Sequence, residues 1–308
     1  MTYTDPKQDI AFKKIFASEG HPKPLISLLN ALLGLKGEQS IVAIEQLNPY
    51  QAPKINGLKE SLLDIRAQDR SGTKFIVEMQ VQKDEHFAKR ALYYSSKAYS
   101  SQIERAQDYL KLNAVYFVGI LNFNLLEGEE YLSRHLVLNE STGQQELKDL
   151  EWTFLELPKM RQEAEELSDL AQKWAYFFKN AQSMGEIPES LAEEAAIVEA
   201  FELANRYSWS AEELEVHEYW SMREGIAQSA LETARHEGEE KGRLEGEKKG
   251  RLEGEEKGRL EGEKKGRLEG EKAKALKIAH SMQQSGMELA TIVELTGLSV
   301  QDISTNCS

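Results

Sequence analysis

The sequence has a single cysteine, Cys307, and no long apolar run. One cysteine cannot form an intrachain disulfide, so nothing points to an oxidising compartment. No stretch reaches the roughly eighteen apolar residues of a membrane-spanning helix. The first ten residues, MTYTDPKQDI, lack the basic and apolar segments of a signal peptide. We therefore expect a cytoplasmic protein with no membrane partner.

Several catalytic signatures are also missing. The sequence has no glycine-rich phosphate loop followed by Lys-Ser or Lys-Thr and no Gly-x-Ser-x-Gly motif. Its six histidines show no paired zinc-ligand spacing, so we interpret them as structural or surface residues. They are His21, His86, His135, His217, His236 and His280.

Negative charge is in excess, but it is unevenly placed. The formal net charge is -14, from 38 Lys and Arg against 52 Asp and Glu. Residues 1–135 hold 17 of these basic and 16 of these acidic residues, which leaves 21 and 36 for the rest of the chain. A near-neutral first part can still present a local basic face to a phosphate backbone, so DNA remains a possible partner.

The first half alternates between helical and strand patterns. Asp5 as a cap, Pro6 and Gln8 form a helix-start signal, and Gly34 closes a later apolar segment. The turn signal DRSG at 69–72 separates two strand-like segments and predicts a hairpin. The expected elements are helices at 6–17, 25–33 and 86–112, and strands at 41–47, 60–68, 73–81, 114–121, 135–140 and 152–157.

The hairpin carries the residues that best suggest chemistry. In the strand 73–81, alternation places Glu78 and Gln80 on the same face, and Asp64 lies in the preceding strand. A register that pairs 64 with 78 brings the two carboxylates to one face, whereas a one-residue shift separates them. Two neighbouring carboxylates repel unless a cation lies between them, and oxygen ligands suit Mg²⁺ or Mn²⁺. Gln80 is a candidate to orient a water or a phosphate.

Three segments together resemble a known family. TDPKQDIAFKKIF (4–16), LKESLLDIRAQDRSGTKFIVEMQVQ (58–82) and KRALYYSSKAYSSQI (89–103) are similar to the Rpn family of recombination-promoting nucleases, often labelled transposases. The resemblance covers about residues 4–158. It implies a restriction-endonuclease-like α/β fold, with a mixed sheet flanked by helices. It also implies a divalent-metal DNA endonuclease linked to recombination or mobile elements.

The resemblance also implies a set of active-site residues. The family's aspartate falls on Asp64, its Glu-x-Gln on Glu78 and Gln80, and the acid of its N-terminal helix on Asp9. The wider PD-(D/E)xK superfamily has lysine where this chain has Gln80, so another residue must supply positive charge near the nucleophile and substrate. The candidates are Lys59, Lys13 and Arg90.

Two questions about this site stay open. Asp9 shares a helical face with Phe12 and Phe16, so it is either a partner of a metal-linked water or an early-turn acid favoured by the helix dipole. The chain as a whole is either an active endonuclease or a catalytically inactive nuclease-fold module that binds DNA or protein. The absent lysine favours the second function, and the intact carboxylate pair favours the first.

The second half is helical and contains a repeat. We divide the chain into a nuclease domain (1–158), a helical region (159–236), a charged repeat segment (237–272) and a small helical tail (273–308). The eight-residue unit KGRLEGEK recurs over 241–272, and its leucines advance about 80° per unit, so they form no straight coiled-coil seam. Glycine at every fourth position costs about 0.8–1 kcal/mol each, which predicts a partly melted spacer or, alternatively, a long charged helix for homo-oligomerisation.

The tail has the outline of a helix-turn-helix. Residues 274–303 read as two helices and a short third helix, with turns near Gly286 and Gly297. No Lys or Arg follows Lys277, whereas DNA-reading helices carry basic or amide side chains. We therefore expect helical packing or oligomerisation here in preference to DNA reading.

Overall fold

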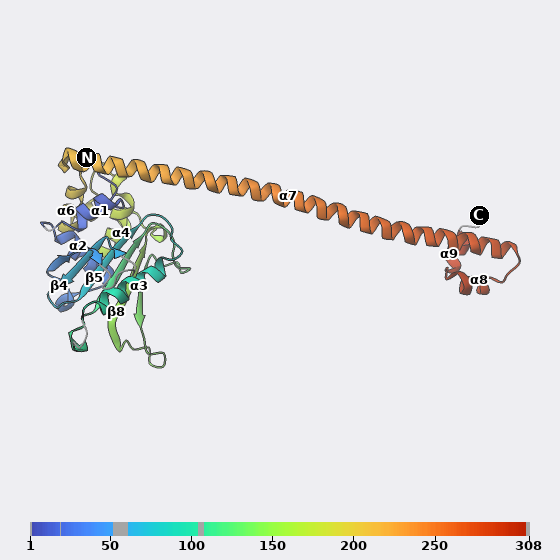
Figure 1. The fold of residues 1–308 in the computed structure, drawn as a ribbon, viewed down its shortest axis with the longest axis horizontal. Helices are drawn as coiled ribbons and strands as arrows, with labels where there is room; N and C mark the ends of the chain where they lie inside the picture. The colour runs from blue at the N-terminus through green and yellow to red at the C-terminus, as the bar shows by residue number, and fades with distance from the viewer. Residues whose placement is uncertain (1, 19, 52–60, 104–107, 306–308) are drawn as a thin grey trace. The chain divides into compact units, whose positions relative to one another are not determined.

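The computed structural model describes residues 2–18, 20–51, 61–103 and 108–305 (Figure 1). The chain divides into two compact units, Met1–Arg223 and Glu224–Ser308. Within the described ranges, every helix is too short or too polar to cross a membrane.

A mixed six-stranded sheet forms the centre of the first unit. Its order is β1-β4-β5-β6-β8-β7. The inner strands β5, β6 and β8 are parallel, whereas β4 is antiparallel to both β1 and β5, and β7 is antiparallel to β8. The strands are β1 (Ile44–Leu47), β4 (Ile65–Asp69), β5 (Lys74–Gln80), β6 (Val115–Leu121), β7 (Leu132–Val137) and β8 (Leu147–Glu156). A separate pair joins β2 (Tyr50–Gln51) to β3 (Ser61–Leu62).

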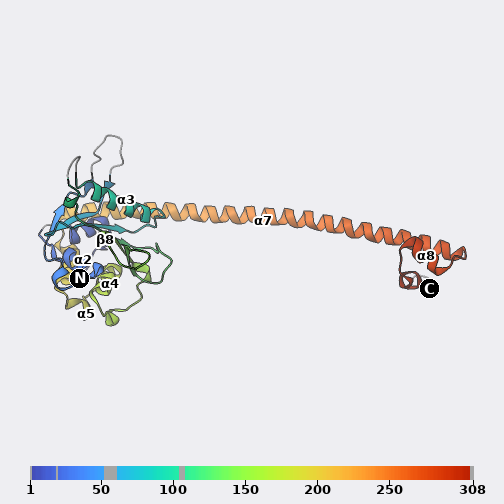
Figure 2. The same ribbon diagram turned by 90° about the horizontal axis from the view of Figure 1, so that it is seen from below.

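Helices cover both faces of the sheet, which confirms the predicted fold class. Figure 2 shows α3 (Phe87–Ser100) on one side, with α2 (Lys23–Leu33), α4 (Leu170–Asn180) and α5 (Glu189–Ala192) on the other. The helix α3 is also the crossover that parallel β5 and β6 require. The helices α1 (Asp9–Phe16) and α6 (Ala195–Ala204) pack with α2 and α4.

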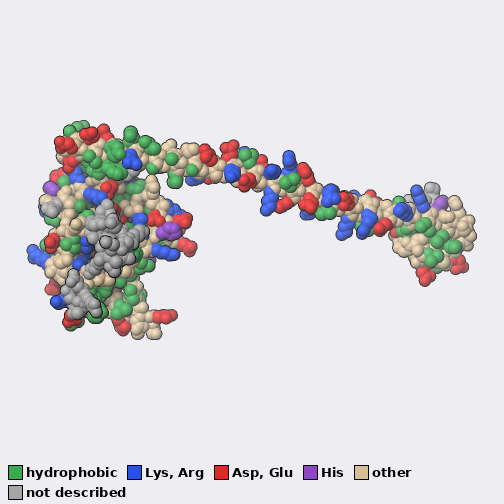
Figure 3. All heavy atoms as spheres, in the orientation of Figure 1, with side chains coloured by type: hydrophobic (Ala, Val, Ile, Leu, Met, Phe, Trp, Pro, Cys, Tyr) green, Lys and Arg blue, Asp and Glu red, His purple; other side chains and the backbone are tan. Residues whose placement is uncertain are grey.

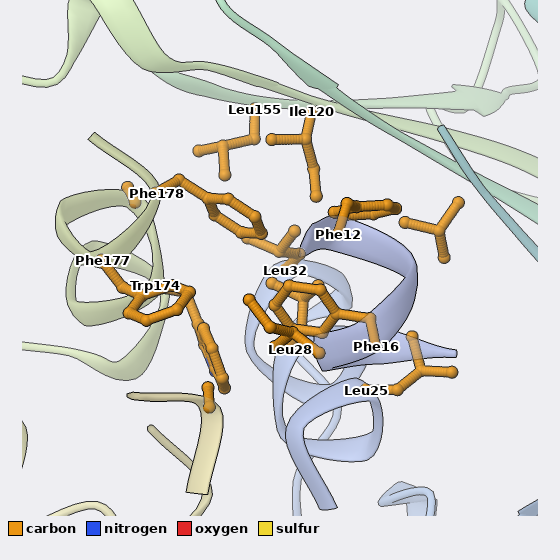
Figure 4. Packing of buried hydrophobic residues seen from close by; sticks show 14 of the residues in the cluster. Phe12, Phe16, Leu25, Leu28, Leu32, Ile120, Leu155, Trp174, Phe177 and Phe178 are labelled. Carbon is orange, nitrogen blue, oxygen red and sulfur yellow. The ribbon is translucent and has the colours of Figure 1, made fainter. Parts of the chain in front are cut away.

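An aromatic cluster joins these helices to the sheet. Phe16 packs edge-on to Trp174 with ring centroids 5.5 Å apart and stacks on Phe178 at 5.4 Å. Figure 4 shows Phe178 and Phe12 next to Leu155 of β8 and Ile120 of β6, with Phe16 and Trp174 further from the sheet. Because each large apolar side chain contributes about 1.5–3 kcal/mol when fully buried, this cluster anchors α1 and α4 on the sheet.

Some predicted boundaries are wrong. The helix predicted at 6–17 begins at Asp9, because Gln8 is the N-cap and Asp5 instead accepts the Lys7 backbone N–H at 3.0 Å. The helix predicted at 86–112 ends at Ser100. Short 3₁₀ helices complete the unit at Gly37–Gln39, Tyr109–Lys111, Leu157–Lys159, Ala164–Glu166, Ala181–Ser183 and Arg206–Ser208.

The helix α7 (Ala211–Gln284) begins in the first unit and is anchored there. Lys14 of α1 forms an ion pair with Glu213 at 2.5 Å. The buried His217 lies edge-on to Trp209, with ring centroids 5.4 Å apart. These contacts fix the start of α7 against the core of the first unit.

In the second unit, α7 continues through the whole repeat. The expected partial melting of 241–272 is not observed. Basic residues pair with the glutamate four positions later, as in Arg243–Glu247 and Arg259–Glu263, so both signs of charge alternate along the surface (Figure 3). Such pairs add roughly 0.2–0.5 kcal/mol each and offset only part of the glycine cost. Packed residues at the end of the helix also spare this segment the unfavourable nucleation step.

A small core ends the second unit. α8 (Leu289–Thr296) and α9 (Val300–Thr305) fold against the last turns of α7. Ala279, Ile292, Leu298 and Ile303 are buried together, and Lys272 forms an ion pair with Asp302 at 2.5 Å. The predicted three-helix outline of the tail is therefore present.

Candidate active site

The β4–β5 hairpin has the register predicted from the sequence. Ile65 pairs with Val77, so the next positions outward are Asp64 and Glu78. Along β5, Val77 and Met79 face the core of α1 and α4, whereas Ile76 faces the core beneath α3. Glu78 and Gln80 therefore share the α3 side of the sheet.

The two carboxylates are joined through the backbone. The Asp64 N–H donates to Oε1 of Glu78 at 3.2 Å, and the Met79 N–H donates to Oδ2 of Asp64 at 2.7 Å. These bonds replace ladder bonds, which explains why the strand predicted at 60–68 is interrupted at Leu63 and Asp64. Oδ1 of Asp64 and Oε2 of Glu78 have no hydrogen-bond partner among the described residues.

Burial raises the pKa of both acids. The pKa of Glu78, which is 3% exposed, rises to about 8 because of burial first and the Asp64 charge second. The pKa of Asp64 rises to about 6 through burial, opposed by the hydrogen bond from Met79. Both acids are therefore costly to ionise without a cation, whereas a cation between them would favour the charged forms.

Three other predicted residues lie within electrostatic range of this pair. The negative charge of Asp9 raises the pKa of Asp64, and the positive charges of Lys13 and Arg90 lower the pKa values of both acids. Asp9 is not on the buried stripe of α1. Its side chain is 55% exposed and pairs with Lys13 at 2.6 Å, so burial does not require a metal-linked partner for it.

Arg90 is held in position by its surroundings. Its guanidinium donates to Asp84 at 2.8 Å and lies 5.0 Å from the ring centre of Phe87 and 6.0 Å from that of Tyr94. Its Nε is buried and has no hydrogen-bond partner in the described part of the chain. Arg90 therefore retains donor capacity close to the two carboxylates.

Gln80 and Lys59 complete the predicted set. Gln80 is the last residue of β5, pairs with Leu121 of β6 and is partly exposed. Lys59 lies outside the described residues. Among the residues that are described, no cluster of three or more His, Cys, Asp or Glu side chains could hold a metal ion. The candidate metal ligands are thus the pair Asp64 and Glu78.

The sequence argument did not single out every residue of this region. Asp84 positions Arg90, and the buried Tyr94 has a pKa raised by burial and by the charges of Glu78 and Asp64. Tyr94 was visible only as an apolar position of a helix. Asp84 gave no signal, because a carboxylate in a polar turn is commonly a surface residue.

A cavity of about 550 Å³ lies elsewhere, at the turn end of the same hairpin. Asp69, Phe75 and Tyr116 are among its lining residues. The turn is at the opposite end of β4 and β5 from Asp64 and Glu78, so this cavity is separate from the carboxylate pair.

Comparisons with known proteins agree with this geometry. A family model described as PD-(D/E)XK nuclease family transposase matches residues 6–234, well over half of the chain. A second, described as the C-terminal HTH domain of the Rpn/YhgA-like nuclease family, matches residues 272–308. No curated protein and no solved structure is significantly similar to the chain. The first match includes the carboxylate pair, and the second includes α8 and α9.

Proposed function

Because this chain belongs to the PD-(D/E)XK nuclease family of transposases, we propose that it is a divalent-metal-dependent DNA endonuclease linked to recombination or mobile elements. The observation that carries the proposal is the pair of buried carboxylates at the end of the hairpin. Each uses one oxygen for a backbone N–H and keeps the other, Oδ1 of Asp64 and Oε2 of Glu78.

The residues present fit a small hard cation. Mg²⁺ is commonly bound by one or two carboxylates together with waters and substrate phosphates, so a pair is sufficient. The raised pKa values of Asp64 and Glu78 add to this fit, since a cation would offset the burial that disfavours their charges. When bound, Mg²⁺ or Mn²⁺ would supply a Lewis acid and an activated water for phosphodiester hydrolysis.

We assign the remaining roles to the neighbours of this pair. Gln80 would orient the water or the scissile phosphate from the position beside Glu78. Asp9, which stands at the position of the family's N-terminal helix acid, would act together with Asp64 and Glu78. Arg90, Lys13 and Lys59 would bind the phosphate backbone, and the partial exposure of the Arg90 side chain, 27%, supports its role.

Cleavage of supercoiled plasmid by the purified full chain tests the proposal. Nicking or cutting should require Mg²⁺ or Mn²⁺ and should fall at least about a hundredfold in Asp64→Asn and in Glu78→Gln. Glu45→Gln, which removes an exposed carboxylate from β1, is the matched control and should cut like the parent. If both site variants retain parental activity, the assignment is wrong.

A second function is favoured by one observation, the glutamine at position 80 where the superfamily has lysine. In this case the chain is a catalytically inactive nuclease-fold module that binds DNA or protein. It would bind duplex DNA in the same experiments but would show no metal-stimulated cleavage. The HTH match at 272–308 supports DNA as a partner for either function.

We retain the division at 158, 236 and 272 as a proposal, with the nuclease domain in 1–158. Homo-oligomerisation through α7 is a further proposal. Its support is the set of half-exposed leucines that recur in the repeat, namely Leu244, Leu252, Leu260 and Leu268. Because they advance about 80° per unit, such an association would not be a straight coiled-coil seam.

A further inference from the structure

Two basic side chains lie close together on the α3 side of the hairpin. Arg66 of β4 is paired with Ile76, and Lys74 of β5 is paired with Gln68. Since side chains alternate along strands, Lys74 shares its face with Ile76 and Glu78, and Arg66 shares it as well. Burial, and then the Arg66 charge, lowers the pKa of Lys74, as expected for neighbouring cations.

This pair differs from several other cations of the first unit that are compensated by carboxylates. Lys7, Lys13, Lys14, Arg90, Arg134 and Lys159 each form an ion pair with a carboxylate. Arg66 instead donates to the backbone carbonyl of Asn48 at 2.6 Å. Within the described ranges, neither Arg66 nor Lys74 has a carboxylate partner. Two half-buried like charges without a counterion are unfavourable, and an anion between them would relieve both burial and repulsion.

Arg66 and Lys74 lie on the same face of the hairpin as Asp64 and Glu78, closer to its turn. Residues two apart on a strand face are separated by about 6.8 Å, so Lys74 lies about 13 Å along β5 from Glu78. At a rise of about 3.4 Å per base pair along the duplex axis, this distance corresponds to roughly four base pairs of B-form DNA whose axis runs parallel to β5. The face therefore presents carboxylates at one end and uncompensated cations further along.

We propose that Arg66 and Lys74 bind phosphates of the DNA strand a few nucleotides from the bond cut at Asp64 and Glu78. This inference rests on the proposed function, because it takes DNA as the substrate. The two residues act as positioning residues that hold the strand in register with the carboxylates. The carbonyl of Asn48 orients the Arg66 guanidinium for this task.

The salt dependence of DNA binding tests the inference without requiring cleavage. The affinity of the full chain for a fluorescein-labelled duplex is measured by anisotropy, without divalent metal, over a range of salt concentrations. Each lost phosphate contact lowers the slope of log K against log salt by about 0.9. Arg66→Gln and Lys74→Gln should each show this loss, and the double variant about twice as much.

Charge-conserving variants separate binding from folding. Arg66→Lys and Lys74→Arg should retain the parental slope, and thermal unfolding of every variant should be measured in parallel. Arg161→Gln removes an exposed cation that is paired with Glu129, and it serves as the control with an unchanged slope. If Arg66→Gln does not fold, the slope measured for Lys74→Gln alone tests the inference.

The outcomes distinguish this inference from the nuclease proposal. If the parent cleaves DNA while Arg66→Gln and Lys74→Gln keep its slope, the phosphate contacts are wrong and the nuclease stands. If the slopes fall as expected but the parent never cleaves, the contacts stand and the nuclease proposal fails. A parent that does not bind the duplex overturns the inference.

Discussion

Asp64 and Glu78 ionise at different pH values because burial penalises both charges and the charge of Asp64 opposes that of Glu78. Near neutral pH without metal, burial and the repulsion between the two charges favour the protonated form of Glu78. Metal binding must then displace the Glu78 proton, so metal affinity should rise with pH up to about 8. Metal binding at the site is thus coupled to the protonation of Glu78.

The stability of the metal-free protein should also depend on pH through Glu78. The folded-state pKa of Glu78, about 8, lies above its ordinary value of 4.5, so Glu78 contributes stability at low pH that is lost as pH rises from 4.5 to 8. The neutral Glu78→Gln side chain avoids this loss. In denaturant titrations with a chelator, the variant and the parent should be similar near pH 5. The variant should be more stable by about a few kcal/mol at pH 8.5. If the free energies of unfolding of the variant and the parent differ by the same amount at all pH values, the raised pKa of Glu78 is wrong.

The positive charge of Arg90 should set the pH at which cleavage begins. Since this charge lowers the pKa values of both acids, Arg90→Gln should raise the midpoint of the pH–rate profile by up to about one unit. Arg90→Lys retains the charge and should leave the midpoint near that of the parent. If both variants lose activity equally with no change in midpoint, Arg90 acts by geometry and not by charge.

At the scale of elements, short-range patterns were predictable and longer-range hydrogen bonds were not. The register of β4 and β5 followed from strand alternation and the DRSG turn, because a one-residue shift would have exposed Val77 and Met79. The interruption at Asp64 could not be predicted, since it depends on side-chain bonds to a backbone 14 and 15 residues away. The cap at Gln8 and the exposure of Asp9 likewise depend on how α1 packs in the folded chain.

The continuous helix through the repeat shows a similar limit. Glycine content predicted melting, yet a Cβ added at Gly246, Gly254 or Gly262 would meet no atom within 4 Å. These glycines therefore serve no packing purpose within one chain. They affect α7 only by lowering its intrinsic helix stability.

Alanine at these three positions should make α7 more stable. Each substitution should add about 0.8–1 kcal/mol of local helix stability, seen as slower amide hydrogen exchange across 241–272 in the full chain. Gly72→Ala is the contrasting variant. Its Cβ would lie 2.6 Å from Oδ1 of Asn113 at a φ of +91°, so it should destabilise the hairpin by about 1 kcal/mol or more. Faster exchange in the triple variant would contradict the view that these glycines only lower helix propensity.

For the whole molecule, the acidic excess lies between the nuclease site and the repeat. Residues 241–308 hold 13 Lys and Arg against 12 Asp and Glu, and residues 136–240 hold 8 against 24. Removing the repeat and the tail therefore changes the net charge by only one unit. Any change in DNA binding after their removal must come from specific contacts and not from the overall field.

A chain that ends at Glu240 should retain metal-dependent cleavage and the parental unfolding temperature of the nuclease unit. The contacts that anchor α7, namely the ion pair of Lys14 with Glu213 and the packing of His217 on Trp209, all precede the truncation. The slope of its DNA affinity against salt should differ from that of the full chain by less than one phosphate contact, about 0.9. The 13 Lys and Arg that are removed are interspersed with 12 Asp and Glu, and none of them follows Lys277 in the tail. Light scattering on both chains would show whether the repeat adds mass by self-association. A larger loss of slope would instead make the HTH tail a second DNA-binding element.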